Sequence, residues 1–149
     1  MSARINDLID AIVAAINAET WSIAVTAERK IRPRYKLAEL QSGIKVAVVP
    51  SARTSEAKTR QGGPNLYTYE IDLGFFDALP GNESERDDLV EARIDLVDAI
   101  SEWWIKRSIT LDGVKAMTIA SAVVPLFDAE YLENGVFASV LTLTLEETR

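Results

Sequence analysis

Residues 66–76 alternate apolar and polar side chains, and a period of two fits only an extended strand that buries one face. The expected buried positions are Tyr67, Tyr69, Ile71, Leu73 and Phe75. Residues 136–145 show the same alternation, with Phe137, Leu141, Leu143 and Leu145 facing inward. Such strands are stable only in a sheet whose apolar face is covered by another layer. The chain therefore needs further strands and covering helices.

Two segments have the spacing of amphipathic helices. Residues 2–18 predict a helix capped by Ser2, with Ile5, Leu8, Ile9, Ile12 and Ile16 on one face. A longer helix is predicted from Asn82 or Ser84 to about Arg107, with Glu85 or Asp87 completing a capping box. Its expected core stripe is Leu89, Ala92, Leu96, Ile100 and Trp103, widened by Val90, Ile94, Val97 and Trp104.

The remaining segments complete an α+β domain. Strands are predicted at residues 22–29, 44–49 and 114–124, a long polar loop at 51–64, and an acidic turn at 128–134. The element order is then α-β-β-β-α-β-β, without the regular alternation that builds a parallel sheet. We therefore expect a single domain over residues 1–149, with a mainly antiparallel sheet and two amphipathic helices packed on it.

Composition limits the chemistry. The chain has no Cys and no His, which excludes disulfides and thiolate metal sites and removes the commonest general base. Gly62-Gly63 lacks the Lys-Ser/Thr of a phosphate loop, and no nucleophile elbow occurs. We therefore expect a protein that is not an enzyme and uses no cofactor. Without an export signal or a long apolar run, a soluble cytoplasmic protein with no membrane partner is expected.

Charge is distributed unevenly. Residues 1–64 hold 10 Lys and Arg and 6 Asp and Glu, whereas residues 65–149 hold 6 and 17, which together give the net charge of -7. The name basic segment is given to residues 29–36, which contain Arg29, Lys30, Arg32, Arg34 and Lys36 and no acid. A solvated surface, pairing between subunits and nucleic-acid binding are all open readings of this segment.

An acidic row is predicted along one edge of the second helix. Its members, which recur every three or four residues, are Asp88, Glu91, Asp95, Asp98 and Glu102. The row is interpreted as a solvated face, as an edge that docks another subunit, or as a hard-cation site. The nearby Trp104 is read equally as a core residue or as an interface residue. The polar loop is expected to be flexible, and its Arg53, Lys58 and Arg60 are candidate contacts for a partner.

The order of these elements resembles the tailed-bacteriophage tail terminator family, also called tail completion or minor tail proteins. The similarity runs from the helix at 2–18 and the basic stretch within 22–36 to the loop at 51–64 and the second helix. Its clearest segments are GIKVAVVP at 43–50, YTYEIDL at 67–73 and FASVLTLTL at 137–145. It rests on the order of the segments, since none of them is a diagnostic motif.

The resemblance implies a structural virion protein of the tail, assembled in the host cytoplasm. Such a protein forms a homohexameric ring on the finished tail tube, ends tube polymerisation and offers the surface that joins tail to head. Its implied partners are further copies of itself, the tail-tube protein and the head-tail connector proteins, while DNA passes through the channel as cargo. The alternatives are another neck or tail component (a head-closure or tail-tube protein), a nucleic-acid-binding accessory protein, and last an enzyme using Asp95 and Asp98.

Overall fold

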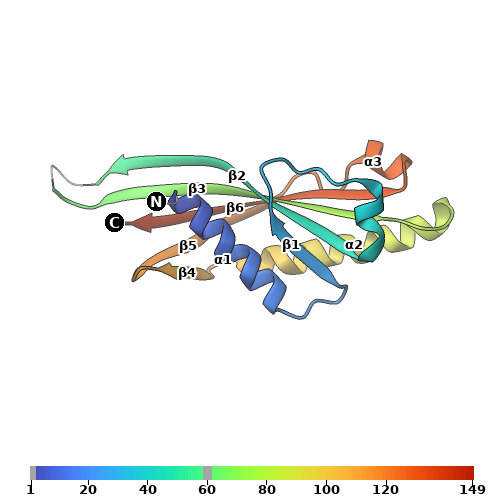
Figure 1. Cartoon of the computed structure of the whole chain (residues 1–149), viewed down its shortest axis with the longest axis horizontal. Coiled ribbons are helices and arrows are strands. Elements are labelled where there is room, and N and C mark those ends of the chain that lie inside the picture. The colour runs from blue at the N-terminus through green and yellow to red at the C-terminus, as the bar shows by residue number, and fades with distance from the viewer. Residues whose placement is uncertain (1–2, 59–61) are drawn as a thin grey trace.

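Strands with alternating apolar residues form the centre of the fold. β3 (Asn65–Ala78) and β6 (Val136–Thr148) pair antiparallel, so that Ile71 lies opposite Leu143 and Leu73 opposite Leu141. These inward-facing residues are fully buried. The computed structural model describes residues 3–58 and 62–149, and Figure 1 shows the long strands running side by side along an elongated molecule.

The sheet has six strands in the order β1-β2-β3-β6-β5-β4, counted over the described residues. The other four strands are β1 (Val25–Arg29), β2 (Ile44–Ala57), β4 (Ser108–Leu111) and β5 (Val114–Val123). All neighbours pair antiparallel except β1 and β2, which are parallel. The predicted α+β class with a mainly antiparallel sheet is therefore confirmed. The short strand β4 was not predicted.

The first helix, α1 (Arg4–Ala18), buries the face that its sequence predicts. Leu8, Ile9, Ile12 and Ile16 are fully buried against the sheet. The predicted cap Ser2 lies outside the described residues. At the other end of the helix, the Asn17 amide donates to the carbonyl of Ala27 and accepts from its N–H. Because these two bonds join α1 to β1, they fix the helix on the β1–β2 side of the sheet.

The second helix, α2 (Glu83–Trp104), begins at the predicted cap, since Asn82 accepts a hydrogen bond from the N–H of Glu85 at 3.0 Å. Its buried stripe is Val90, Leu96, Val97, Ile100 and Trp104, whereas Ala92 is exposed. The buried stripe is therefore rotated about the helix axis relative to the predicted one. α2 has apolar residues around much of its circumference, so contact with β5 and β6, rather than spacing, decides which of them are buried.

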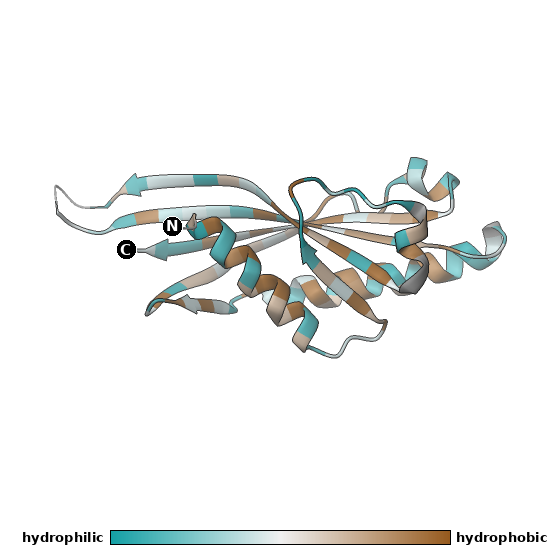
Figure 2. Cartoon of the chain, viewed as in Figure 1, coloured by the Kyte–Doolittle hydropathy of each residue, from teal (hydrophilic) through white to brown (hydrophobic). Residues whose placement is uncertain are grey.

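The predicted polar loop at 51–64 is wrong over its first half. β2 continues to Ala57, and residues from Ala52 onward pair with β3, Arg53 opposite Tyr69 and Ala57 opposite Asn65. Most side chains of this outer half are exposed, and Figure 2 colours it mainly teal and white. No helix covers the strand there, so its sequence lacks the apolar residues that mark a half-buried strand.

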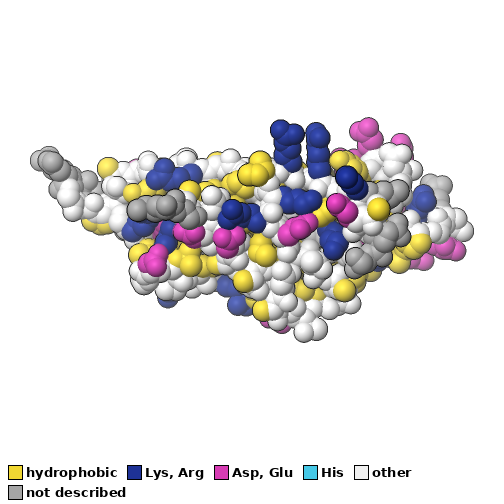
Figure 3. Space-filling model, in the orientation of Figure 1, with side chains coloured by type: hydrophobic (Ala, Val, Ile, Leu, Met, Phe, Trp, Pro, Cys, Tyr) yellow, Lys and Arg dark blue, Asp and Glu magenta, His cyan; other side chains and the backbone are white. Residues whose placement is uncertain are grey.

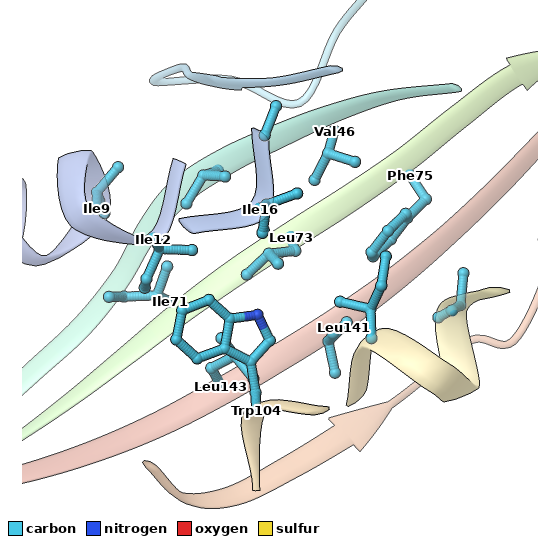
Figure 4. Close-up of a cluster of buried hydrophobic side chains, with 14 of the residues drawn as sticks. Ile9, Ile12, Ile16, Val46, Ile71, Leu73, Phe75, Trp104, Leu141 and Leu143 are labelled. Carbon is cyan, nitrogen blue, oxygen red and sulfur yellow. The ribbon is translucent and has the colours of Figure 1, made fainter. Parts of the chain in front are cut away.

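Both helices pack on one face of the sheet and share one core. The cluster joins residues of α1, α2 and the inward positions of the strands, and Figure 4 shows Trp104 pointing towards Ile12, Ile71 and Leu143. On the opposite face, a smaller cluster contains Leu40 from the 3₁₀ helix η1 (Leu37–Ser42), with Ala47, Phe76 and Ala138. The predicted acidic turn at 128–134 contains a short helix, α3 (Ala129–Glu133), capped by Asp128.

Candidate interaction surfaces

The basic segment (residues 29–36) follows β1 and crosses the sheet on the face opposite α1 and α2. Pro33 lies over Gly74 of β3, 3.4 Å from the position that a Cβ at residue 74 would occupy. The Tyr35 ring packs on Phe76 with centroids 5.6 Å apart, and Lys30 Nζ lies 3.7 Å above the Tyr35 ring. These contacts fix the segment as an ordered surface, where Figure 3 shows Lys and Arg side chains gathered.

Charges within the basic segment differ in their partners. Arg29 pairs with Asp10 of α1 at 3.1 Å, and Lys30 lies 3.7 Å from Glu28 while donating to the carbonyl of Arg34. Arg32, Arg34 and Lys36 are exposed. Within residues 3–58 and 62–149, the Arg32 and Arg34 side chains have no hydrogen bond or ion pair. In the same described residues the exposed Lys36 ammonium has no ion pair either, so these three groups are the charges in this segment that a partner would neutralise.

The acidic row of α2 faces solvent as predicted. Asp88, Glu91, Asp95, Asp98 and Glu102 are all exposed, and none pairs with a cation in the described part of the chain. Among those residues, no three acidic side chains lie close enough together to bind a metal ion. Neither Asp95 nor Asp98 lines a described cleft. The row is a charged surface rather than a pocket.

The two adjacent tryptophans of α2 differ from their predicted positions. Trp104 has no exposed surface and belongs to the core, so the expectation that it contacts a partner is wrong. Trp103 lies at the rim instead, where its ring packs edge-on against Trp21 and Trp104 at 5.3 and 4.9 Å. Arg107 stacks on the outer side of Trp103 at 3.6 Å. These contacts are those of a residue that completes the edge of the core, so Trp103 is assigned to packing within the domain and not to a partner contact.

The predicted flexible loop residues have different positions. Arg53 lies within β2, and its guanidinium is 5.1 Å from the Tyr67 ring of β3. It is therefore held on a hairpin, which corrects the loop assignment. Lys58 is exposed just after β2 ends. Arg60 lies outside the described residues.

A buried carboxylate that the sequence pattern did not reveal joins the two ends of the chain. Glu147 of β6 has a fully buried side chain that accepts from Arg4 of α1 at 3.0 Å and from Arg149 at 3.0 Å. It also accepts a 2.8 Å hydrogen bond from the Tyr69 hydroxyl. Burial opposes ionisation of Glu147, but these three donors outweigh it and lower its pKa, while burial raises the pKa of Tyr69. Glu147 is thus held as an anion.

An exposed apolar surface was also missed. The name apolar ridge is given to Val124, Pro125, Leu126, Phe127 and Tyr131, all of which are exposed. Its backbone is ordered by β6, because the N–H of Val124 donates to the carbonyl of Val140 at 3.0 Å. The Val140 N–H donates back to the carbonyl of Pro125 at 3.2 Å. An ordered, exposed group of large apolar side chains is typical of an interaction surface. The unbroken apolar run at 122–127 is the sequence feature from which this surface could have been predicted.

Comparison with protein-family models gives no match for this chain, and comparison with curated protein sequences gives none either. None of the described helices combines the length and apolar character needed to cross a bilayer.

Proposed function

We propose that this chain is a structural protein of a bacteriophage tail, which forms a ring on the tail tube, ends its polymerisation and provides the surface that joins tail to head. One observation carries the proposal. A single α+β domain presents unpaired cations at Arg32 and Arg34 and, on a different element, unpaired carboxylates along α2. Charges left unpaired within one copy are available to a second copy.

Two complementary patches at different places on one subunit favour head-to-tail association. Such a contact is heterologous, because each copy uses one patch towards its left neighbour and the other towards its right neighbour. The series closes into a ring when the rotation between copies divides the circle, and otherwise it grows as a filament. A tail terminator requires the first outcome, since a ring with no free patches cannot extend the tube.

The net charge is compatible with a channel through which DNA passes. At -7 per copy, an assembled ring carries a large negative charge, which disfavours retention of DNA by the phosphate attraction common to nucleic-acid-binding proteins. The assembled ring would accordingly let DNA pass through and connect tail to head, rather than bind the genome.

Reversing two of these unpaired charges is expected to weaken assembly. The double variant Arg32→Glu, Arg34→Glu should raise the concentration at the midpoint of self-association by about tenfold or more, because like charges replace an attractive pair. It should also lose the ability to stop growth of purified tail tubes. Sedimentation velocity and electron microscopy of capped tubes measure the two effects.

A matched control makes the same change in net charge at two positions outside the basic segment. Lys106→Glu with Lys115→Glu alters two exposed cations outside the basic segment, and its assembly should match that of the wild-type chain. Equal weakening by both double variants would mean that total charge, and not the basic segment, governs association. Unchanged assembly of the Arg32→Glu, Arg34→Glu variant would remove the observation on which the proposal rests.

The exposure of Arg32, Arg34 and Lys36 also favours a second candidate, a nucleic-acid-binding accessory protein. Its signature is affinity for duplex DNA that falls steeply with added salt, since each phosphate contact releases counterions. Tight, salt-sensitive binding by a monomer would favour this candidate. Unlimited polymerisation would instead favour a tail-tube protein of the same particle.

A further inference from the structure

A cleft of about 480 Å³ lies at the end of the sheet, where the chain leaves β3 and enters β6. Its lining includes Leu79 and Pro80, which follow β3, and Asn134 and Gly135, which precede β6. The N–H of Leu79 donates to the carbonyl of Gly135 at 2.8 Å. This backbone bond joins the two connections, so the cleft is built on ordered chain.

Two arginines of α2, Arg86 and Arg93, also line this cleft, but only one of them is neutralised. Arg93 donates from Nε to the Asp77 carboxylate at 2.8 Å and from Nη1 to the carbonyl of Leu89 at 3.3 Å. Arg86, in contrast, has no hydrogen bond or ion pair through its side chain within residues 3–58 and 62–149. The charged groups that line the cleft therefore leave one positive charge uncompensated.

The Arg86 guanidinium is confined although no counter-ion holds it. The side chain is half-buried, and its Nε is buried without a hydrogen-bond partner in the described structure. Its Nη2 lies so close to Gly135 that a Cβ at residue 135 would be 3.1 Å from it. Gly135 has a φ of +74°, so glycine both permits this backbone turn and leaves room for the guanidinium. A partly desolvated charge without a partner is unfavourable, and an anion bound in the cleft would lower that cost.

We infer that this cleft binds a carboxylate, which the Arg86 guanidinium holds by charge-assisted hydrogen bonds while Ala78 and Pro80 contact the aliphatic chain that carries it. Both of these apolar residues line the cleft. A guanidinium can donate two parallel hydrogen bonds to a carboxylate, which gives the contact direction as well as charge. The ligand is a monoanion with an aliphatic stem, either a glutamate side chain of a protein partner or a free short-chain acid. This site goes beyond the proposed ring and does not depend on it.

Neighbouring charges favour a carboxylate over a phosphate. Arg86 also lines an adjoining cleft of about 420 Å³, together with Asp87 and Glu133. These two side chains are exposed and form no ion pair in the part of the chain that the structure describes, so they repel further negative charge. A phosphate group carries a charge of about −1.5 to −2 at neutral pH, more than one free guanidinium can neutralise. A single carboxylate requires only one.

Titration calorimetry with butyrate tests the site, because butyrate is a monoanion with an aliphatic stem. The wild-type chain should give a saturable heat of binding, and Arg86→Met should bind butyrate at least about tenfold more weakly, since it lacks the charge and every donor. Butyramide, which has a similar shape without the charge, should also bind the wild-type chain at least about tenfold more weakly. Tighter binding of inorganic phosphate than of butyrate would overturn the assignment to a carboxylate.

Arg107→Met is the matched control. It removes an arginine that follows the other end of α2, where the guanidinium stacks on Trp103 at 3.6 Å, so its affinity for butyrate should equal that of the wild-type chain. Equal weakening in Arg86→Met and Arg107→Met would mean that butyrate responds to the total charge of the chain. That result would overturn the inference.

Melting temperatures separate a binding residue from a packing residue. Arg86→Met keeps an apolar stem and removes an unsatisfied buried donor, so the free variant should melt at or above the wild-type temperature. Butyrate should raise the melting temperature of the wild-type chain and of Arg107→Met, but not that of Arg86→Met. If Arg86→Met melts far below the wild-type chain and butyrate does not stabilise the wild-type chain, Arg86 is a packing residue and the inference fails.

A second probe distinguishes the two sources of the carboxylate. The acetylated and amidated tripeptide Ala-Glu-Ala presents the same group on a peptide backbone. Binding of this peptide at least about tenfold tighter than butyrate would assign the site to a protein partner, whereas equal or weaker binding would assign it to a free acid. If neither probe binds the wild-type chain, the inference is overturned. The proposed ring would be unaffected, because its contact uses Arg32 and Arg34.

Discussion

Replacing Trp104 with alanine is expected to lower the free energy of unfolding by about 3–5 kcal/mol, far more than a substitution on the surface of the domain. Trp104 is the largest fully buried side chain among the described residues, and it fills the space between α1, α2 and the central strands. Truncation to a methyl group leaves a cavity that the surrounding Ile and Leu side chains fill only in part. Chemical denaturation followed by circular dichroism measures the change.

Two further variants separate packing from other effects. The buried Nε1 of Trp104 has no hydrogen-bond partner in the described structure, so Trp104→Phe keeps most of the packing and removes an unsatisfied donor. Its cost should be less than half that of alanine. Phe127→Ala, at a side chain 41% exposed, should also cost much less. Equal losses for Trp104→Ala and Phe127→Ala would contradict the assignment of Trp104 to the core.

Glu147→Gln is the second substitution with a large expected effect. It removes the negative charge that Arg4 and Arg149 contact while leaving the Arg4 side chain, only 12% exposed, in the same place. Breaking a buried ion pair by removing one partner costs about 3–5 kcal/mol, because the remaining charge is left poorly solvated. Arg4 keeps its contact with the exposed Asp112 at 3.3 Å, which places the expected loss near the lower end of that range.

The same group gives stability a dependence on pH. The pKa of Glu147 is lowered from its ordinary value of 4.5, so ionised Glu147 stabilises the folded chain above that value. This contribution is lost as pH falls through the lower folded pKa. The difference in unfolding free energy between wild type and Glu147→Gln should therefore be large at neutral pH and shrink in acid.

A neighbouring glutamate is the matched control. In the described part of the chain, Glu146 forms no hydrogen bond or ion pair through its side chain, so Glu146→Gln should leave the stability at neutral pH nearly unchanged. A difference between wild type and Glu147→Gln that persists undiminished in acid would show that the loss comes from packing and not from charge.

Periodicity predicted the parts of this fold in which one face is buried. The alternation at 66–76 and 136–145, the helical stripe of α1 and the Asn82-Glu85 cap all depend on local spacing, and the structure confirms each of them. The same rule failed for the outer half of β2. That strand is held by backbone hydrogen bonds to β3 with no helix over it, so its side chains carry no pattern to detect.

Tertiary packing explains the other differences. Trp103 and Trp104 are adjacent on a helix with apolar residues around much of its circumference, so only docking on β5 and β6 decides which ring is buried. Glu147 follows Leu143 and Leu145 in the alternation of inward-facing residues along β6, and this alternation was the only sequence feature that indicated its burial. The predicted strand ended at residue 145, so Glu147 was not included. Its partners Arg4 and Tyr69 lie 143 and 78 residues away in the chain, beyond the reach of any local pattern.

Native mass across a concentration series at moderate salt tests the central claim of a closed assembly most directly. With a chain of 16.4 kDa, a hexameric ring would have about six times that mass, near 98 kDa, and images of it should show a central hole. The account predicts one discrete species of this kind, formed by the free chain or induced by purified tail tubes. A chain that remains monomeric at every concentration and does not bind tail tubes would contradict it.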